Sequence, residues 1–447
     1  MTGTDWLNSE AAVARSKKPY AHFDWRTDIA HQREYIANPC NVATHGFYPF
    51  IHYEKRTLKF NRKKGRKEKK RDICYAAHID RCIYQYYSFL LNSLYNKRVE
   101  QDGISVVAVA YRTNLLKSNI HFSKRAFDFI KATSPVYVMI GDFTGFFDNL
   151  DHAYLKKQWC SLLGVAKLPD DHYAVFKNIT SYSKFELTDL LRLNELEDTK
   201  SGRKALNSLA RVLTPEQFKA NRSFVKRNIN PYGIPQGSPI SGLLANVYML
   251  DVDKMIHDAV QKLGGMYIRY SDDFMIVLPD TSEIDAEKEL TQISKMLKQA
   301  PRLELEPNKT QYFHYANGVL TNCGKSFHDE ADDSSQTINF LGFSFDGHKI
   351  RIRAKTVSKY YYRMYRKANN TVELRRKVPI GKTISGKNLY MSYSRKGAKT
   401  GYGNFLTYVN RAADVYGKTE AIRQDTRRHM QKIRKVLSDT KTDSKSK

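Results

Sequence analysis

Three aspartates have the residue type and the positions that metal-dependent phosphoryl transfer needs. Asp142 follows the apolar segment Pro135–Gly141, and Asp272 and Asp273 are adjacent between two other short apolar segments. Transfer of a phosphoryl group to a 3′-hydroxyl uses two hard cations, roughly 3.5–4 Å apart, that clamp the attacking and leaving oxygens. Mg²⁺ prefers oxygen ligands and keeps several waters, so a few carboxylates are enough. Each aspartate also has an ordinary alternative as a turn or capping residue.

The apolar segments around the aspartates predict the strands that would position them. Pro135–Gly141 (PVYVMIG) has the length and the β-branched content of a buried strand. Met266–Tyr270 and Phe274–Leu278 are two further strands, and the paired aspartates lie at the tip of the tight hairpin between them. If these strands are neighbours in one sheet, the three carboxylates converge.

Helix caps define the segment that follows the first strand. Asp151 can N-cap a helix through Cys160, and Gly164 ends it. Residues 165–230 are mostly polar and indicate a helical insertion, in which Thr214 caps a helix that begins with proline.

The second half of the chain alternates between helices and strands. In residues 233–241 (GIPQGSPIS), Ser238 caps and Pro239 opens a long helix. Later patterns predict one more helix and a strand pair that turns at an Asp-Gly dipeptide, namely Ile284–Lys298, Ile338–Phe345 and Ile350–Arg353.

The charge of the chain favours a polyanionic partner. Its 447 residues carry a formal net charge of +28, which is expensive to hold in a compact fold unless a polyanion neutralises it. Nucleic acid is the usual partner, although a membrane surface or a ribosome would satisfy the same charge. The densest basic run, Lys55–Arg71, is either a solvated loop or a basic hairpin able to hold a phosphate chain.

Composition indicates an ordinary globular protein of a reducing compartment. Hydrophobic residues make up 41% and charged residues 27%, no apolar run has the length of a bilayer span, and the start lacks a signal-peptide pattern. The five cysteines are scattered and never spaced as C-x-x-C, which argues against a disulfide frame or a zinc site. We therefore expect a cytoplasmic protein that does not act on a membrane.

The three aspartates belong to a set of five ordered motifs: Asp142 with Phe146-Phe147, GIPQGSPIS, Tyr270-Ser271-Asp272-Asp273, Asn308-Lys309-Thr310 and Phe340-Leu341-Gly342-Phe343. In this order they resemble the palm motifs of reverse transcriptases, and an ordered set is far more specific than any single motif. The resemblance covers about residues 71–353. It implies an α+β right-hand polymerase with fingers, a palm built on an antiparallel sheet with helices on one face, and a helical thumb.

The resemblance implies an RNA-directed DNA polymerase that adds dNTPs to a 3′-hydroxyl. Asp142 and Asp272 would be the principal ligands of two Mg²⁺ ions, with Mn²⁺ as the substitute metal, and Asp273 would be a third, less direct carboxylate. The implied partners are an RNA template, the DNA product and dNTPs. The hydroxyl that starts synthesis could come from RNA, DNA or a protein side chain.

A nucleotide-binding set follows from the same resemblance. Phe147 matches the aromatic gate that abuts the sugar 2′ position, and its alternative is a core aromatic. Gln236 and Gly237 match the pair that lines the nascent base pair, where glycine permits close backbone approach. Lys309 falls near the pyrophosphate leaving group or is a solvated charge at a strand end. Phe143, which follows Asp142 directly, is also expected to belong to this nucleotide-binding set.

Further residues would contact the triphosphate, the template and the primer. Arg71 resembles the fingers arginine that grips the incoming triphosphate. Arg112 resembles a fingers arginine that faces the template, with a plain surface residue as its alternative. The template and primer set also includes Tyr270 and the primer grip formed by Phe340, Leu341 and Gly342, although the same alternation suits any packed strand.

These elements predict a division of the chain in six parts: 1–134, N-terminal extension and fingers; 135–164, palm with the first carboxylate strand; 165–230, helical insertion on the fingers side; 231–353, palm; 354–437, helical basic thumb; and 438–447, disordered tail.

The long insertion between Asp142 and Gly233 resembles the bacterial unknown-group and defence-associated reverse transcriptases rather than retron or group II intron enzymes. Such enzymes act in antiviral defence, often with a noncoding RNA or a partner protein, and some form homo-oligomers. Two alternatives remain. An RNA-dependent RNA polymerase would use Asp148 to sense ribose but would lack the Phe147 gate. A catalytically silent palm-fold nucleic-acid-binding protein would have no reason to cluster three anions.

Overall fold

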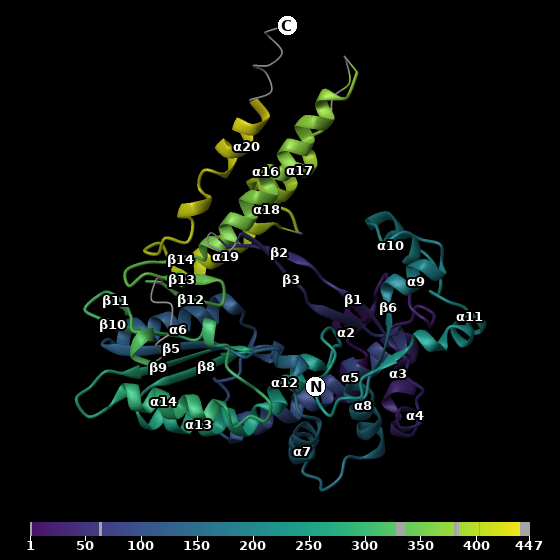
Figure 1. The fold of residues 1–447 in the computed structure, drawn as a ribbon, viewed down its shortest axis with the longest axis horizontal. Coiled ribbons are helices and arrows are strands. Elements are labelled where there is room, and N and C mark those ends of the chain that lie inside the picture. Colours follow the sequence, from purple (N-terminus) through teal and green to yellow (C-terminus); the bar gives the residue numbers. More distant parts are fainter. Residues whose placement is uncertain are drawn as a thin grey trace.

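The computed structural model describes residues 2–61, 65–327, 336–379, 382, 384–401 and 403–438. Figure 1 shows three regions: a central sheet with flanking helices at lower left, an N-terminal region at right, and long C-terminal helices that stand above the sheet. Within the described ranges, no helix combines the length and the apolar character needed to cross a bilayer.

Five antiparallel strands form the central sheet, in the order β11-β10-β5-β9-β8. Their bounds are Val136–Asp142 (β5), Met266–Tyr270 (β8), Asp273–Pro279 (β9), Gln311–Ala316 (β10) and Val319–Asn322 (β11). The predicted strand and hairpin are therefore confirmed as direct neighbours. β5 lies at the centre of the sheet, which explains why its sequence is almost continuously apolar.

Alternate side chains of β5 and β9 enter two different cores. Met139 and Ile276 pack with α13 (Leu250–Lys262) and α14 (Ala286–Leu297), which cover one face of the sheet. Val138 and Met275 pack on the other face with α6 (Asn119–Thr133). The helix expected at 284–298 is thus confirmed as α14. Burial on both faces makes the sheet a rigid base for groups at its end.

A second sheet joins segments that are far apart in the sequence, in the order β4-β1-β6-β7. Its strands are Phe50–Glu54 (β1), Asp72–Tyr75 (β4), Ser183–Glu186 (β6) and Lys226–Arg227 (β7). The insertion expected to be helical at 165–230 does contain four α-helices, but β6 and β7 also lie within it, which the sequence did not indicate. Phe185 alternates with polar neighbours and packs against Ile51 and Phe23, so this short segment buries one side chain as a strand does.

Helices surround this second sheet. They are α1 (Gly3–Leu7), α2 (Glu10–Ser16), α3 (Ile29–Ala37), α4 (Pro39–Ala43), α5 (His78–Gln101), α7 (His152–Leu163), α8 (Asp170–Thr180), α9 (Leu187–Leu193), α10 (Lys200–Leu206) and α11 (Pro215–Ala220). The expected caps are confirmed: Asp151 accepts a hydrogen bond from Tyr154 N at the start of α7, Gly164 ends it in the left-handed conformation, and Thr214 forms a capping box on α11.

The basic run at 55–71 forms a two-stranded hairpin, as one of its two interpretations predicts. Strands β2 (Thr57–Asn61) and β3 (Gly65–Lys69) pair antiparallel, and residues 62–64 lie outside the described residues. In Figure 1 the hairpin extends from the N-terminal region toward the C-terminal helices.

The helix expected to open at Pro239 begins two residues later and is divided in two. The segments are α12 (Ser241–Tyr248) and α13, which meet at Met249. A turn occupies the residues before α12, and Ser241 Oγ closes it by donating to the carbonyl of Pro235 at 2.7 Å. Because this turn continues through Ile240, the cap expected at Ser238 does not form.

The chain after residue 335 forms a small sheet and a helical region. The strand expected at 338–345 is broken into β12 (Ile338–Phe340) and β13 (Phe343–Phe345), because Leu341 and Gly342 both have positive φ. β14 (Ile350–Ile352) completes the expected pair with β13. The helices of this region are α16 (Ala354–Arg376), α17 (Lys387–Tyr393), α18 (Arg395–Ala398), α19 (Phe405–Tyr416) and α20 (His429–Ser438). A short helix, α15 (Gly324–Phe327), precedes it. Of the expected tail, Ser438 ends α20 and residues 439–447 lie outside the described residues.

Candidate active site

The hairpin tip lies beside the end of β5, as the sequence predicts. Asp142 and Asp273 are opposite each other in the antiparallel register of β5 and β9. Phe143 N donates to the carbonyl of Asp272 at 3.3 Å, which ties the hairpin tip to the residue after Asp142. Three carboxylates that are up to 131 positions apart in the sequence (142 to 273) are therefore brought to one end of the sheet.

The three carboxylates repel one another. Desolvation by the surrounding protein, followed by repulsion from Asp272 and Asp142, raises the pKa of Asp273 to about 7. Burial, and then Asp142, also raises the pKa of Asp272. Lys309 partly offsets this charge, since its Nζ lies 2.9 Å from Asp142 Oδ2. The site thus has more negative charge than its own residues neutralise.

A divalent cation fits this excess of carboxylate oxygen. Mg²⁺ and Mn²⁺ prefer such ligands, and a bound cation favours the ionised form of a carboxylate. Across the described ranges, no group of three or more acidic, histidine or cysteine side chains is arranged so that it could hold a metal ion. The aspartates are neighbours in the sheet, and Asp142 is paired with the Lys309 ammonium, which supplies positive charge at this carboxylate.

A buried ion pair holds the turn that carries Asp272. Arg269 and Asp253 are almost inaccessible to solvent, with Arg269 Nη2 2.5 Å from Asp253 Oδ2 and Nε 2.8 Å from Oδ1. Arg269 Nη1 also donates to the carbonyl of Ser271 at 2.9 Å. Ser271 has φ of 63°, a conformation that costs energy for a residue with a side chain. The ion pair therefore supports the hairpin turn from behind.

We expect Arg269→Met to lower the free energy of unfolding by about 3–5 kcal/mol, because it leaves the Asp253 carboxylate buried without its cation. Urea unfolding measures this change. The double variant Arg269→Met/Asp253→Asn removes both charges and should recover part of the loss. A loss below about 1 kcal/mol for the single variant would contradict the structural role of the pair.

The Gln236-Gly237 element packs on the N-terminal sheet. Gly237 has φ of 113°, and a Cβ there would lie 2.4 Å from the carbonyl oxygen of Cys74. The backbone of Gln236 accepts a hydrogen bond from Cys74 N at 2.8 Å, and its side chain hydrogen-bonds Asp148. Burial raises the pKa of Asp148, and this bond lowers it again. The element thus connects the residues after β5 with β4.

Gly237→Ala should lower the free energy of unfolding by at least about 1–3 kcal/mol, because alanine meets both an unfavourable φ and a backbone carbonyl. Gly46→Ala is the matched control, since an added Cβ there meets nothing within 4 Å. Thermal or urea unfolding compares the two. Equal stability of the two variants would show that the close approach to Cys74 is not required.

The two phenylalanines expected to contact nucleotide have different environments. Phe147 is half-buried at the 3₁₀ turn Phe146–Asp148, and its carbonyl accepts a hydrogen bond from Ile234 N at 2.9 Å. Its side chain packs against the core with part of its surface exposed. Phe143 is only 2% exposed and packs against Phe146 and Phe274. The structure therefore corrects the prediction for Phe143, whose side chain is part of the core.

The two arginines expected to contact the triphosphate and the template, Arg71 and Arg112, differ in their exposure to solvent. Arg71 is exposed at the base of the β2–β3 hairpin, where its backbone pairs with Lys55. Arg112 is 4% exposed, and its guanidinium donates to Asn96 Oδ1, to Ser105 and to the carbonyl of Ala108. The prediction that Arg112 faces the template is therefore not supported. Its donors are used inside the protein, and desolvation lowers its pKa.

Of the three residues expected to form the primer grip, only the two in the turn, Leu341 and Gly342, have surface that a primer could contact. Phe340 is buried, while Leu341 and Gly342 form the positive-φ turn between β12 and β13. The carbonyl of Leu341 accepts a hydrogen bond from Asn119 Nδ2 at 2.9 Å, which fixes the turn to α6. Tyr270 is half-buried at the end of β8, with its ring near that of Phe122.

Two supporting residues were missed by sequence reasoning. Arg269 is a charged residue inside the apolar strand MYIRY, and its spacing of two from buried Tyr267 was the signal that it points into the core. Tyr111 OH lies 3.0 Å from Ser271 Oγ, so a second side chain contacts the turn. Nothing in the local pattern around Tyr111 indicates that contact.

The fold and the site together define an α+β polymerase fold with a carboxylate cluster at the end of adjacent antiparallel strands. Residues 192–345 match the family model described as "Reverse transcriptase (RNA-dependent DNA polymerase)". The matched stretch includes the Gln236-Gly237 element, the hairpin aspartates and Lys309, so this part of the chain is similar to the reverse transcriptase family. Asp142 lies before the matched range, and it is the sheet register that brings it to the other two aspartates.

Distant structural likenesses are to yeast telomerases. Apo telomerase of Candida tropicalis truncated from its C-terminal domain has 15% identity and a TM-score of 0.39, over 73% of this chain and 60% of that one. Telomerase of Candida albicans with a fragment of telomeric RNA has 15% identity and a TM-score of 0.35, over 92% and 65%. This chain spans less than two thirds of the length of these telomerase chains. No curated protein matches the sequence.

Proposed function

We propose that this protein is an RNA-directed DNA polymerase that adds dNTPs to a 3′-hydroxyl. The observation that carries the proposal is the register of β5 and β9, which sets Asp142 opposite Asp273 next to the hairpin tip. The family match over residues 192–345 supports the same reaction class. Asp142, Asp272 and Asp273 would hold two divalent ions, Mg²⁺ or Mn²⁺, which when bound activate the hydroxyl and stabilise the charge of the leaving pyrophosphate.

The other residues of the site would bind and orient the nucleotide. Lys309, now paired with Asp142, places an ammonium group where the triphosphate charge would lie. Arg71 is exposed at the root of the basic hairpin and would grip the incoming triphosphate. Phe147 would exclude a 2′-hydroxyl, and Gln236 would contact the nascent base pair from a backbone fixed by Cys74.

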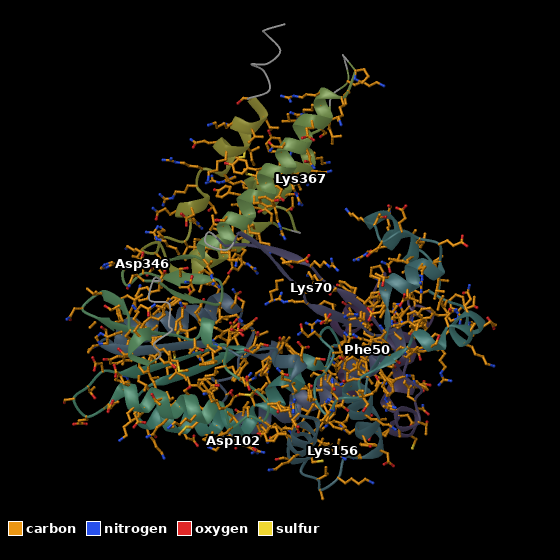
Figure 2. The ribbon with its side chains drawn as sticks, in the orientation of Figure 1. Phe50, Lys70, Asp102, Lys156, Asp346 and Lys367 are labelled. Atoms are coloured by element: carbon orange, nitrogen blue, oxygen red, sulfur yellow. The ribbon has the colours of Figure 1, made fainter. Side chains whose placement is uncertain are left out.

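The C-terminal helices offer a surface for the nucleic-acid duplex. On α16, Tyr362 is 63% exposed and is flanked by exposed Lys359 and Arg363. Basic residues neutralise phosphates, and an exposed tyrosine can stack on a base. Figure 2 shows Lys367 on the same helix. Its Nζ donates to Asn388 O and Ser392 Oγ, so Lys367 instead fastens α17 to α16.

Primer extension with purified protein tests the reaction. Wild-type protein should extend a primer on an RNA template with dNTPs in the presence of Mg²⁺ and should prefer dNTPs to NTPs. A preference for NTPs would replace this proposal with an RNA-dependent RNA polymerase. Tight nucleic-acid binding without extension on any template or primer would indicate a catalytically silent binding protein.

We also propose that the enzyme acts in the bacterial cytoplasm in antiviral defence, together with a noncoding RNA. The net charge of +28 supports an RNA partner, and the 165–230 segment, which supplies β6 and β7 to the N-terminal sheet, is the feature that resembles defence-associated enzymes. Sequencing of the nucleic acids that copurify with the protein should find one predominant RNA. A random sample of cellular RNA would contradict a dedicated partner.

A further inference from the structure

A cavity of about 730 Å³ opens on the N-terminal region between α4, α8 and the β6–β7 strands. None of its lining residues belongs to the proposed polymerase site. α4 and α8 lie at the lower right of Figure 1, away from the β8–β9 hairpin. Small-molecule sites occupy roughly 300–1,000 Å³, so the cavity has room for a ligand of nucleotide size.

One carboxylate, Asp170 at the start of α8, lines this cavity together with three cations: Lys177 on α8, Arg222 in the turn before β7, and Arg227 in β7. All three are exposed, and in the described part of the chain no carboxylate pairs with them. Other basic residues of the same region do have carboxylate partners: Lys184 pairs with Glu186, Arg192 with Asp189 and Arg203 with Asp198. The cavity therefore presents positive charge that the protein leaves available to an anion.

The cavity also offers an aromatic ring and fixed polar groups. Tyr173 on α8 is 41% exposed, and Lys156 on α7, labelled in Figure 2, holds its ammonium 5.0 Å from the ring centre. Asn178 Oδ1 accepts a hydrogen bond from Tyr84 OH, so its Nδ2 remains a donor. His45 is held by hydrogen bonds to Tyr35 OH at 2.8 Å and Asp80 Oδ1 at 2.9 Å.

We propose that this cavity binds a nucleoside phosphate, with the phosphate on Arg222, Arg227 and Lys177 and the base against Tyr173. Guanidinium groups match phosphate oxygens in geometry and charge, and a base can stack on an aromatic ring regardless of its identity. The same chemistry is presented by a free nucleotide and by a nucleotide within an RNA strand. Either occupant would be held apart from the polymerase site.

Binding of a fluorescent ATP analogue tests whether the cavity takes a free nucleotide. The measurement is made in EDTA, because triphosphate binding at the carboxylate site needs a divalent metal and is suppressed when the metal is removed. A short RNA that contains 4-thiouridine, crosslinked by light and mapped by mass spectrometry, tests the strand. The variants are Arg222→Ala/Arg227→Ala and, separately, Lys177→Gln. Lys200→Ala/Lys204→Ala on α10 removes two exposed charges from the same region outside the cavity and is the matched control.

The cavity variants should lose about tenfold or more in affinity for the probe that binds, and the α10 control should change less than about twofold. Binding of the ATP analogue that depends on the cavity would identify a free nucleotide as the occupant. Crosslinks to the α8 and β7 segments that disappear in the cavity variants would identify an RNA strand. Equal binding and equal crosslinking by the cavity variants and the control would overturn the proposal. Primer extension on a short template should be unchanged in every variant.

Discussion

Replacing Asp272 by Asn is expected to lower the rate of DNA synthesis by at least roughly 10²–10³-fold, because it removes a carboxylate that would hold the divalent cations, and these cations stabilise the charge of the transition state. The substitution keeps the size of the side chain and removes one negative charge from a cluster whose members already repel one another. Stability should therefore stay the same or rise. Nucleic-acid affinity should also stay the same or rise, because a basic protein loses one anion from its binding face.

Single-turnover primer extension measures the rate, and fluorescence anisotropy with the same primer and template measures affinity. Asp258→Asn is the matched control, since Asp258 lies on α13 in an exposed pair with Lys254. It should leave extension within about twofold of wild type. Persistent synthesis by the Asp272→Asn protein would show that the hairpin carboxylate is not part of the reaction.

Phe147→Val should relax discrimination against ribonucleotides by roughly 10–200-fold, the range in which a pocket rejects one additional group. Phe147 is half-buried and lies five positions after Asp142, on a 3₁₀ turn held by Ile234. A smaller side chain there opens space beside the sugar 2′ position and makes no new contact with a deoxynucleotide. The kcat/KM for NTPs should rise while that for dNTPs changes little.

Phe146→Val is the control for this effect. Phe146 is 3% exposed and stacks on Phe143 within the core, so its truncation should reduce stability by several kcal/mol without changing the preference between sugars. Incorporation of matched dNTP and rNTP on one template separates the two outcomes. If the two variants discriminate equally well against ribonucleotides, Phe147 is a core aromatic rather than a gate.

Elements with a strong local signal could be predicted from the sequence. The strand before Asp142 is almost wholly apolar, the hairpin around Asp272 is short and symmetric, and Asp151 and Thr214 cap their helices as expected. Local patterning was sufficient there because each element buries its own apolar side chains.

Features that depend on tertiary contacts could not be predicted. β6 has four residues and is a strand because β1, whose paired residues lie 134 positions earlier, provides a parallel partner and β7 provides an antiparallel one. Arg112 was expected to face the template or to lie on the surface, yet it is buried and donates to four acceptors on Asn96, Ser105 and Ala108. Phe143 directly follows Asp142, so the resemblance included it, although the strand alternation turns its side chain into the core.

The central claim is that Asp142, Asp272 and Asp273 jointly hold a pair of divalent ions. Crystals of the protein grown with Mn²⁺ and a non-hydrolysable dNTP analogue, measured at the manganese absorption edge, test it most directly. Two anomalous peaks within coordination distance of the Asp142 and Asp272 carboxylates are predicted, and neither should appear in the Asp272→Asn protein. Manganese bound elsewhere, or no peak between the end of β5 and the hairpin tip, would contradict the claim.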